Sequence, residues 1–378
     1  MSFRKWTMVD LWVFYPFQAR LVSGEGFPLA GKWFRAACAA AAVAALAAGC
    51  SSGGGSAAAG SNAMSSLSIG PAEKTTLNVG VVPAMDSAGF FVALHEGLFA
   101  REGLTINYTP AVSSDTVIGS QLQGKLDITG GNYVSYIQAV AEKHDPFEVI
   151  AEGSVMQQGS QVIFTMPKSN IKTLAGLKGQ VLGVNAPGNI DYLLDVSVLS
   201  ENGVSVNSVK FSSQPIPFPD MAGELSSGKI DAATMPEPFA SIAEQQLGAV
   251  TLADLNQGAT QEFPIEGYVV TKAWAKANPN TLARFLAALE QGQEIADTNR
   301  GAVEQAFETI KGGAPDGRVQ ANIAAVIALN TYPIGIDQAR LQRVADVMHQ
   351  FGLLPTRFDV GDMVLPASAF DFAAFSSS

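Results

Sequence analysis

One segment comes close to a phosphate-binding P-loop. The stretch Gly119-Ser-Gln-Leu-Gln-Gly124-Lys125 has the glycines and the lysine of that motif at nearly the right spacing. It lacks the hydroxyl residue that must reach magnesium, since Leu126 stands there, and it runs from a predicted helix into a strand, which is the reverse of a P-loop. A second Gly-Lys pair at 228–229 lacks the first glycine. Both lysines are therefore expected at solvated helix ends, and no P-loop is predicted.

Other residues that could support catalysis or hold a metal are scattered. His95, His144 and His349 lie far apart, and none has a partner at metal-ligand spacing. The chain has no Gly-x-Ser-x-Gly elbow for a serine nucleophile. Its two cysteines, Cys38 and Cys50, leave the rest of the chain without a thiol nucleophile, a disulfide or a cysteine metal site. We therefore predict no catalytic residues, no metal and no cofactor, and a protein that is not an enzyme.

The charge of the chain argues against nucleic acid as a partner. The formal net charge is −11, and it becomes −14 without the first 49 residues, which hold five basic and two acidic ones. Such a surface repels nucleic acid and anionic membranes, and no basic stripe offsets it. With 378 residues, 47% of them apolar, the chain can bury one large core or two ordinary ones.

The N-terminal segment is typical of an export signal. An apolar run over 36–48 is too short to cross a bilayer but suits a signal peptide. It ends in Leu46-Ala-Ala-Gly-Cys50, which resembles the lipobox of bacterial lipoproteins with its leucine one position early. We predict a signal and upstream segment over 1–49, lipidation at Cys50, and a flexible Ser/Gly/Ala-rich tether over 50–72. The protein is then expected outside the cytoplasm, anchored to the cell membrane.

The rest of the chain contains an internal repeat of about a hundred residues. Gly80-Val81 recurs 103 residues later as Gly183-Val184, and Gly124-Lys125 recurs 104 residues later as Gly228-Lys229. Each copy runs strand, turn, helix, strand, helix, strand, which is a βαβαβ unit. Two similar α/β lobes are therefore predicted, and paired lobes commonly close on a ligand. The alternative is a single doubly wound sheet, which also repeats strand, turn and helix.

Hydrophobic periodicity and capping residues predict the elements that position any site. Strands are expected at 76–82, 104–108, 126–129, 147–152, 161–166 and 267–271, with another from Val181. Helices are expected at 88–96, from about Ser114 to Gly124, at 133–142, from Asn189 to Gly203, after Pro236, and at 279–298, 302–310, 318–329 and 337–350.

Four motifs, in order along the chain, resemble one protein family. The segment 93–104 resembles its "GLF…EGL" element, and 171–184 resembles the opening of its second lobe, "I-x-x-L-x-D-L-K-G-K-x-V-G-V". The segment 231–238 resembles its "DA…EP" turn, and 271–279 its "F-x-x-x-H-P" helix. Together these motifs resemble the extracytoplasmic solute-binding proteins of ABC importers, in the group that takes nitrate, sulfonates, taurine or thiamine precursors.

The resemblance implies an α/β, two-lobed periplasmic-binding-protein fold of type II, with two βαβαβ lobes joined by a double-crossover hinge. Lobe 1 would comprise 73–166 and 268–365, including C-terminal helices packed on it, and lobe 2 would comprise 167–267. A small solute would dock at the strand ends, where helix N-termini face the cleft. The lobes would close on it, and the loaded form would deliver it to an ABC permease and its ATPase.

The resemblance places the ligand contacts in the turns that follow the strands. In lobe 1 they are Asp86, Ser87, Phe90, Ser113, Ser114, Asp115, Asn132 and Tyr133. In lobe 2 they are Gly188, Asn189, Asp191, Tyr192, Phe218 and Glu237. Structural alternatives stay open, because Ser114, Asp115 and Asn189 can cap helices and Glu237 can satisfy a helix N-terminus. One of Phe90 and Phe91 is expected in the core, since both cannot face one side of a helix.

These contacts favour some solutes over others. Carboxylates at Asp86, Asp191 and Glu237 lie with aromatic residues in or beside the predicted turns, whereas every arginine after position 90 lies outside them. A pyrimidine-like heterocycle or an amine therefore suits the site better than a sulfonate.

Two other functions stay open. One is a thiamine-pyrimidine synthase-like enzyme, whose relatives use a cysteine-rich motif that is missing here, and the other is a sensor lipoprotein of the same fold.

Overall fold

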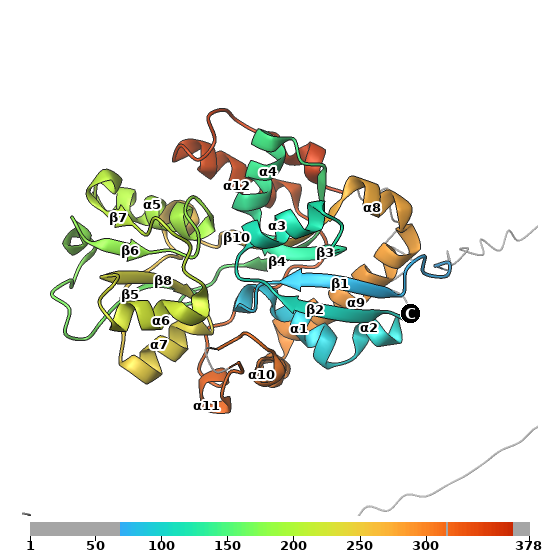
Figure 1. Ribbon diagram of the computed structural model, residues 1–378, viewed down its shortest axis with the longest axis horizontal. Coiled ribbons are helices and arrows are strands. Elements are labelled where there is room, and N and C mark those ends of the chain that lie inside the picture. The colour runs from blue at the N-terminus through green and yellow to red at the C-terminus, as the bar shows by residue number, and fades with distance from the viewer. Residues whose placement is uncertain (1–68, 315–316, 366–378) are drawn as a thin grey trace, which may run out of the picture. The chain divides into compact units, whose positions relative to one another are not determined.

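The computed structural model describes residues 69–314 and 317–365. The predicted signal segment, the lipidation site at Cys50 and the tether up to residue 68 lie outside these ranges. The described chain forms two lobes, each built on a five-stranded mixed sheet with helices against it (Figure 1). The predicted α/β, two-lobed fold class is confirmed.

The sheet of lobe 1 has the strand order β2-β1-β3-β10-β4. Its strands are β1 (Thr76–Val81), β2 (Thr105–Pro110), β3 (Ile128–Asn132), β4 (Phe147–Val155) and β10 (Pro264–Thr271). Strands β1, β2 and β3 are parallel, with Val79 of β1 opposite both Tyr108 and Ile128, and β10 is antiparallel to β3 and β4. The parallel strands therefore end at a common edge, where Asn132 of β3 pairs with Glu266 near the start of β10.

The sheet of lobe 2 repeats this topology with the order β7-β6-β8-β5-β9. Its strands are β5 (Gln161–Thr165), β6 (Val181–Gly183), β7 (Lys210–Phe211), β8 (Ala232–Pro236) and β9 (Val250–Asp254). Each sheet takes its antiparallel fourth strand from the segment that crosses over from the other lobe. This arrangement confirms the two similar units that the repeat predicted, and it excludes a single doubly wound sheet.

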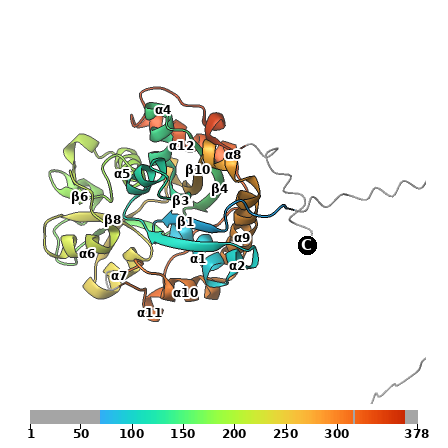
Figure 2. The same cartoon turned by 45° about the vertical axis from the view of Figure 1, so that its right-hand side comes forward.

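Helices cover the faces of both sheets (Figures 1 and 2). The chain from β1 to β4 contributes α1 (Ala88–His95), α2 (Leu98–Arg101), α3 (Ser114–Leu122) and α4 (Tyr133–Lys143). The segment between β5 and β10 contributes α5 (Ile190–Glu201), α6 (Phe218–Ser226) and α7 (Phe239–Leu247). After β10 follow α8 (Lys272–Ala277), α9 (Pro279–Thr298), α10 (Arg300–Thr309), α11 (Ala321–Ala324) and α12 (Gln338–Gln350). Single 3-10 turns lie at Met85–Ser87 (η1), Leu174–Leu177 (η2), Val206–Ser208 (η3), Gly258–Thr260 (η4) and Val360–Met363 (η5).

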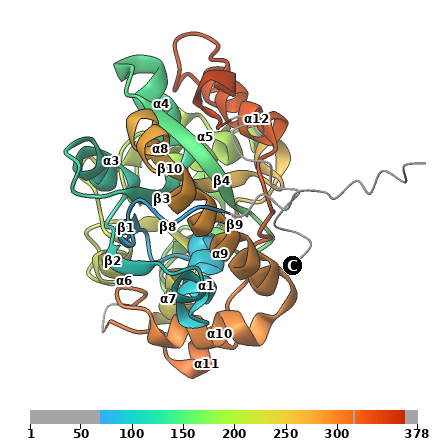
Figure 3. The ribbon, with the colours of Figure 1, turned by 90° about the vertical axis from the view of Figure 1, so that its right-hand side faces the viewer.

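The C-terminal helices pack mainly on lobe 1. Helix α9 lies against α1, and α12 lies beside α4 (Figure 3). The crossing of α1 and α9 is close because glycines face it. A Cβ atom on Gly292 would lie 2.3 Å from the carbonyl oxygen of Gly89, and one on Gly89 would lie 2.5 Å from Cγ of Gln293. The Gln293 side chain can then donate from Nε2 to the carbonyl oxygens of Glu152 and Gly153 in β4.

The connections between the lobes lie several residues before the predicted boundaries. Strand β5 belongs to the sheet of lobe 2 and β10 belongs to that of lobe 1, so the chain crosses at 156–160 and returns at 255–263. The predictions were 164–168 and 265–272. The difference arises because β5 and β10 are buried strands whose apolar pattern does not reveal which sheet accepts them.

The predicted helix over 318–329 is wrong for most of its length. Only Ala321–Ala324 is helical, and the chain then continues without a helix over 327–332, a segment called the strap below. In the strap, the N–H of Ala328 donates to Oε1 of Glu237, and Thr331 exchanges both backbone hydrogen bonds with Val155. These partners satisfy backbone groups that a helix would have paired internally.

Candidate ligand site between the lobes

A small cavity lies where the strand ends of the two lobes meet. Its volume is about 20 Å³, which is room for about one water molecule. Its walls come from both lobes and from both crossing strands. The lining residues are Val82, Asp86, Ser114, Asn132, Gln161, Asn185, Asn189, Ile190, Asp191, Phe218, Ile265 and Glu266.

Asp86 enters the cavity from the turn η1, directly after β1. The carboxylate oxygen Oδ1 accepts hydrogen bonds from Asn330 Nδ2 at 2.8 Å and from Ser154 Oγ at 3.3 Å. Only 7% of Asp86 is exposed. Burial raises the pKa of Asp86 to about 6, although the donors Asn330 and Ser154 oppose the rise.

Glu266 lies beside Asp86, although 180 residues separate them in the sequence. Its Oε1 accepts a hydrogen bond of 2.5 Å from Ser87 Oγ. A glycine on the neighbouring strand leaves the room for this side chain, since a Cβ on Gly153 would lie 2.8 Å from Cγ of Glu266. Burial, and then the charge of Asp86, raise the pKa of Glu266 well above its ordinary value. Burial and the neighbouring carboxyl group therefore favour the neutral form of Glu266.

Ser114 and Asn132 form a neutral wall of the cavity in lobe 1. Asn132 caps α4, because its Oδ1 accepts from the N–H of Ser135 at 2.9 Å. Ser114 Oγ accepts from both the backbone N–H and the Nδ2 of Asn132, at 2.9 and 2.8 Å. Gly131 permits this contact, since a Cβ there would lie 2.6 Å from Ser114 Oγ. The polar ends of two helices are thus tied together before any ligand binds.

Asp191 faces the cavity from the first turn of α5 in lobe 2. Its Oδ2 accepts from the backbone N–H of Asn185 at 3.0 Å, and Asn189 caps the same helix by accepting from the N–H of Tyr192. Asp191 is fully buried, and this burial raises its pKa to about 7. The charge of Asp86 adds to the rise. Carboxyl groups from opposite lobes therefore interact across the cavity.

The two lobes contact each other around the cavity. Asn185 Nδ2 donates across the cleft to the carbonyl oxygen of Val112 at 3.1 Å, and Gln138 Nε2 donates to that of Gly188 at 3.2 Å. The N–H of Met85 also donates to the carbonyl oxygen of Glu237 at 2.8 Å. This arrangement of the lobes is a closed one.

Acceptor oxygens without a donor lie in and beside the cavity. Three buried oxygens have no hydrogen-bond donor among the described residues, namely Gln161 Oε1, Asp191 Oδ1 and Asn330 Oδ1. The lining residues include three carboxyl groups and no Lys, Arg or His. Buried acceptors without donors are costly, by about 1–3 kcal/mol each. The site is therefore suited to a molecule that brings hydrogen-bond donors.

Sequence comparison assigns the chain to a family. A profile of NMT1/THI5-like proteins matches residues 84–299, which is more than half of the chain. The chain belongs to the NMT1/THI5-like family. The matched range begins just before Asp86 and contains every residue that lines the cavity except Val82.

Two curated proteins are related to this family member over most of its length. A putative thiamine biosynthesis protein of Haemophilus influenzae is 27% identical over 293 residues, which cover 71% of this chain and 84% of that protein. The nitrate/nitrite binding protein NrtA of Nostoc is 24% identical over 256 residues, which cover 62% of this chain. This chain spans 57% of the length of that nitrate/nitrite binding protein.

Solved structures share the fold. The alkanesulfonate-binding protein SsuA of Xanthomonas axonopodis, bound to MOPS, superposes with a TM-score of 0.64 at 18% identity, covering 78% of this chain and 99% of SsuA. The periplasmic nitrate-binding protein NrtA of Synechocystis gives 0.69 at 15% identity, covering 82% and 90%. The desulfurization enzyme DSZB gives 0.55 at 16% identity, covering 78% and 98%. The fold is thus shared by solute-binding proteins and by an enzyme.

Six of the fourteen predicted contact residues line the cavity: Asp86, Ser114, Asn132, Asn189, Asp191 and Phe218. Four others lie next to the site. Ser87 donates to Glu266, Ser113 caps α3, and Gly188 accepts a hydrogen bond from Gln138 in the other lobe. Asp115 is exposed on the first turn of α3.

The remaining four predicted contact residues do not line the cavity. Phe90 is buried in the core of lobe 1 among Phe91, Phe99, Tyr108 and Tyr268, because α1 is apolar on all sides there. Phe91 is also buried, so both rings pack in the core and neither lines the cavity.

Tyr133, Tyr192 and Glu237 also lie away from the cavity. The ring of Tyr133 is buried against Gly267, where a Cβ would lie 2.6 Å from the ring. Tyr192 packs edge-to-face on Phe211 with ring centroids 4.7 Å apart. Glu237 accepts from Ser241 and from the N–H of Ala328, so it joins lobe 2 to the strap.

Sequence reasoning missed Gln161, Asn185 and Glu266 as lining residues. Gln161 and Glu266 are polar residues at or near the start of buried strands, and both are nearly inaccessible to solvent. That anomaly, a polar residue within an apolar run, is the signal that could have identified them. Asn185 follows β6 in the turn before α5, three residues before Gly188, where the predicted contacts of lobe 2 begin.

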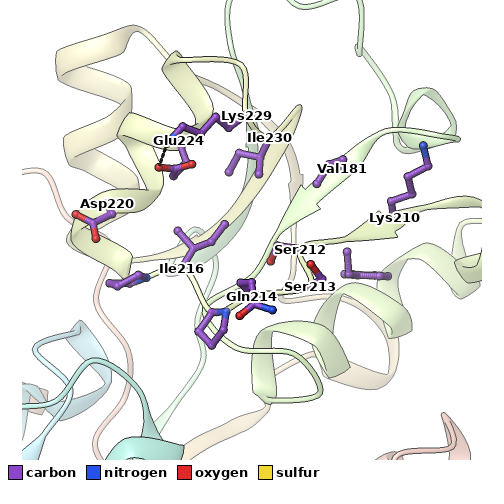
Figure 4. Close-up of a pocket in the computed structure, with 13 residues that line it drawn as sticks. Val181, Lys210, Ser212, Ser213, Gln214, Ile216, Asp220, Glu224, Lys229 and Ile230 are labelled. Carbon is purple, nitrogen blue, oxygen red and sulfur yellow. Dashed lines mark hydrogen bonds and ion pairs between the residues drawn. The ribbon is translucent and has the colours of Figure 1, made fainter.

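Larger concavities lie elsewhere. One of about 530 Å³ lies at the outer edge of lobe 2, where β6, β7 and the segment 212–217 face α6 (Figure 4). Its Lys229 forms a 2.7 Å ion pair with Glu224. Another of about 500 Å³ lies beside the strap and contains Arg340 and Arg343, which already bind Glu152 and backbone carbonyls. Neither is built from the strand ends of both lobes.

The described part of the chain shows neither a metal-binding cluster nor a membrane-spanning helix. Residues 69–314 and 317–365 contain no group of three or more His, Cys, Asp or Glu residues placed to hold a metal ion. Among the same residues, no helix has the length and apolarity needed to cross a bilayer.

Proposed function

We propose that this protein is the solute-binding component of an ABC-type importer. It captures a small organic solute between its lobes and delivers it to a membrane permease driven by its ATPase. The observation that carries this proposal is the cavity itself, whose polar lining comes from both lobes and from both crossing strands. A site shared in this way exists only when the lobes close, so solute binding and lobe closure are coupled.

Solute exchange requires the lobes to separate. The cavity has room for about one water molecule in this closed arrangement, so an organic solute is accommodated only when the lobes stand further apart than they do here. The two connections at 156–160 and 255–263 are the candidate hinge. They contain Gly159 and Gly258, both with positive φ, and a change of a few backbone angles there would move one lobe as a body.

The place of action follows from the N-terminal segment. We propose that the protein works outside the cytoplasm, with Cys50 as its lipid-bearing residue and the Ser/Gly/Ala-rich stretch as a tether. A short tether would hold the binding lobes near the permease and raise their effective concentration there. Mass spectrometry of membrane-extracted protein would test this, since a mature N-terminus at Cys50 with an added diacylglyceryl group is expected.

The rival function is an enzyme, and the shared fold of DSZB keeps it open. The cavity residues offer no Cys, His or Lys as a nucleophile or base, and their carboxyl groups are held by neutral donors. We therefore favour capture without conversion. Incubating the purified protein with small pyrimidines, amines, taurine and alkanesulfonates, followed by mass spectrometry of the solutes, should return every compound unchanged.

Small-angle scattering tests the proposed function directly. The described lobes should become more compact when a bound solute stabilises the closed arrangement, and one solute of the panel should raise the melting temperature in parallel. In the closed arrangement Asn185 Nδ2 donates to the carbonyl oxygen of Val112 in the other lobe, so Asn185→Ala should weaken the compaction. Glu224→Gln, at the outer edge of lobe 2, is the control and should leave it intact. A protein whose compactness no solute changes would contradict the proposal.

A further inference from the structure

The charge of the cavity indicates the class of solute. Asp86, Glu266 and Asp191 are each at least nine-tenths buried, and the lining residues supply no positive side chain. A buried carboxylate without a positive partner is unstable, so it either takes up a proton or binds a cation. Here the raised pKa values of all three groups show the same conflict between burial and charge.

Unpaired acceptors supply a second and independent observation. Gln161 and Asp191 both line the cavity, each is 2% exposed or less, and Gln161 Oε1 and Asp191 Oδ1 have no donor among the described residues. These two oxygens come from the crossing strand β5 and from helix α5. A solute that satisfies both must carry at least two hydrogen-bond donors.

Several donors that could hold an anion are already used within the chain. The N–H of Ser135 in the first turn of α4 donates to Asn132, and the N–H of Tyr192 in the first turn of α5 donates to Asn189. The N–H of Asn185, in the turn before α5, donates to Asp191. Helix N-termini are the usual anion sites in α/β folds, but here a side-chain oxygen accepts from one N–H of each of these two helices. An oxyanion would also meet the three carboxyl groups of the lining.

We propose that the solute is a compact organic monocation with N–H donors, of the amidinium or amine class, bound between Asp86 of lobe 1 and Asp191 of lobe 2. This inference rests on the proposed function. When both carboxylates are ionised and the cleft is empty, their repulsion favours separated lobes. A cation between them removes that repulsion and makes charge-assisted hydrogen bonds to each, so the charge of the solute drives closure.

Three small probes of matched shape test the proposal. Acetamidinium, acetamide and acetate differ mainly in charge, being positive, neutral and negative. Each is titrated into the full chain at about pH 8, roughly one unit above the raised pKa of Asp191, which is about 7. Melting temperature and scattering report binding and closure. We expect acetamidinium to bind at least about tenfold more tightly than either of the other probes.

Variants of Asp86 and Asp191 test whether these two carboxylates cause the preference for acetamidinium. Asp86→Asn and Asp191→Asn keep the side-chain shape, and each should abolish the advantage of acetamidinium over acetamide. Asp220→Asn makes the same change of charge at an exposed position in lobe 2, and it should retain the advantage. Circular dichroism confirms that each variant is folded.

Equal responses to the three probes, including no response to any of them, would overturn the cation assignment. A preference for acetate would overturn it as well. Persistence of the acetamidinium preference in Asp191→Asn would place the cation elsewhere and also count against it. Compaction by nitrate or by an alkanesulfonate, without any effect of acetamidinium, would overturn the solute class alone, because the lobes would still close on a solute as the proposed function requires.

Discussion

The two lobes have the same topology but equip the cavity differently. Ser114 and Phe218 are the first residues of α3 and α6, 104 residues apart, and both line the cavity. Asp86 and Asn189 are 103 residues apart, close to the same offset, and both line it too. The repeat therefore brings corresponding backbone positions to the cavity, while the chemistry at those positions differs between the lobes.

The crossing strands show this difference most clearly. Glu266 of β10 pairs with Asn132 at the end of β3, and Gln161 of β5 pairs with Pro236 at the end of β8. These are corresponding positions, and one holds a carboxyl group where the other holds an amide. The carboxyl groups of lobe 1 receive donors from Ser87, Ser154 and Asn330, whereas Asp191 of lobe 2 keeps one oxygen unpaired. We infer that lobe 1 is preorganised and that lobe 2 supplies the acceptor that the solute must satisfy.

The largest expected effect is a dependence of stability on pH. Asp86 and Asp191 have pKa values of about 6 and 7 in the folded state, above the value of about 3.9 in unfolded chains, so the folded protein binds more protons. Their contribution is full below about pH 4 and is lost as the pH rises through 6 and 7. The free energy of unfolding of the solute-free protein should therefore fall by about 2–4 kcal/mol between about pH 5 and pH 8. Urea titrations measure it.

Single variants divide this pH effect between the lobes. Asp86 faces Asn330, Ser154 and Glu266, and Asp191 faces Asn185 and, across the cavity, Asp86. Because its pKa is raised further, Asp191→Asn should remove more of the pH dependence than Asp86→Asn does. A free energy of unfolding that rises between about pH 5 and pH 8 in the parent protein would contradict the raised pKa values of Asp86 and Asp191.

A second prediction concerns the support that lobe 1 receives from α9. Gly292→Ala should lower the free energy of unfolding by about 1–3 kcal/mol, because its Cβ would lie 2.3 Å from the carbonyl oxygen of Gly89 and force α9 away from α1. Gly223→Ala in α6 of lobe 2 is the matched control. No atom lies within 4 Å of its Cβ, so it should raise stability by about 0.5–1 kcal/mol. Equal losses in both variants would mean that the helix contact is not the cause.

The smallest effect is expected at Glu266, the carboxyl group on the crossing strand β10. Glu266→Gln should change the affinity for acetamidinium less than about threefold, which is under 1 kcal/mol, because the raised pKa of Glu266 favours its neutral form and Ser87 already donates to its Oε1. The same measurement on Asp191→Asn serves as the comparison. A loss at Glu266 as large as the loss at Asp191 would show that Glu266 is ionised and shares the cation.

Much of the molecule could be predicted from its sequence. The offsets of 103 and 104 residues identified two similar lobes, and the possible cap at Asn189 identified the start of α5. Local signals of this kind act through nearby backbone groups, so they survive without knowledge of the fold. The strap after α11 could not be predicted, since its helix-like spacing is overridden by partners at Glu237 and Val155 from distant segments.

The sequence by itself determined the two α/β lobes, the helix caps and the carboxyl-bearing turns that hold Asp86 and Asp191. Only the tertiary structure decided that Glu266 and Gln161 join them, because those residues arrive on antiparallel strands that cross between the lobes. It also decided the charge state of the site. A carboxyl group has an ordinary pKa in the unfolded chain, and its pKa rises only when folding removes water and brings another carboxyl group across the cavity.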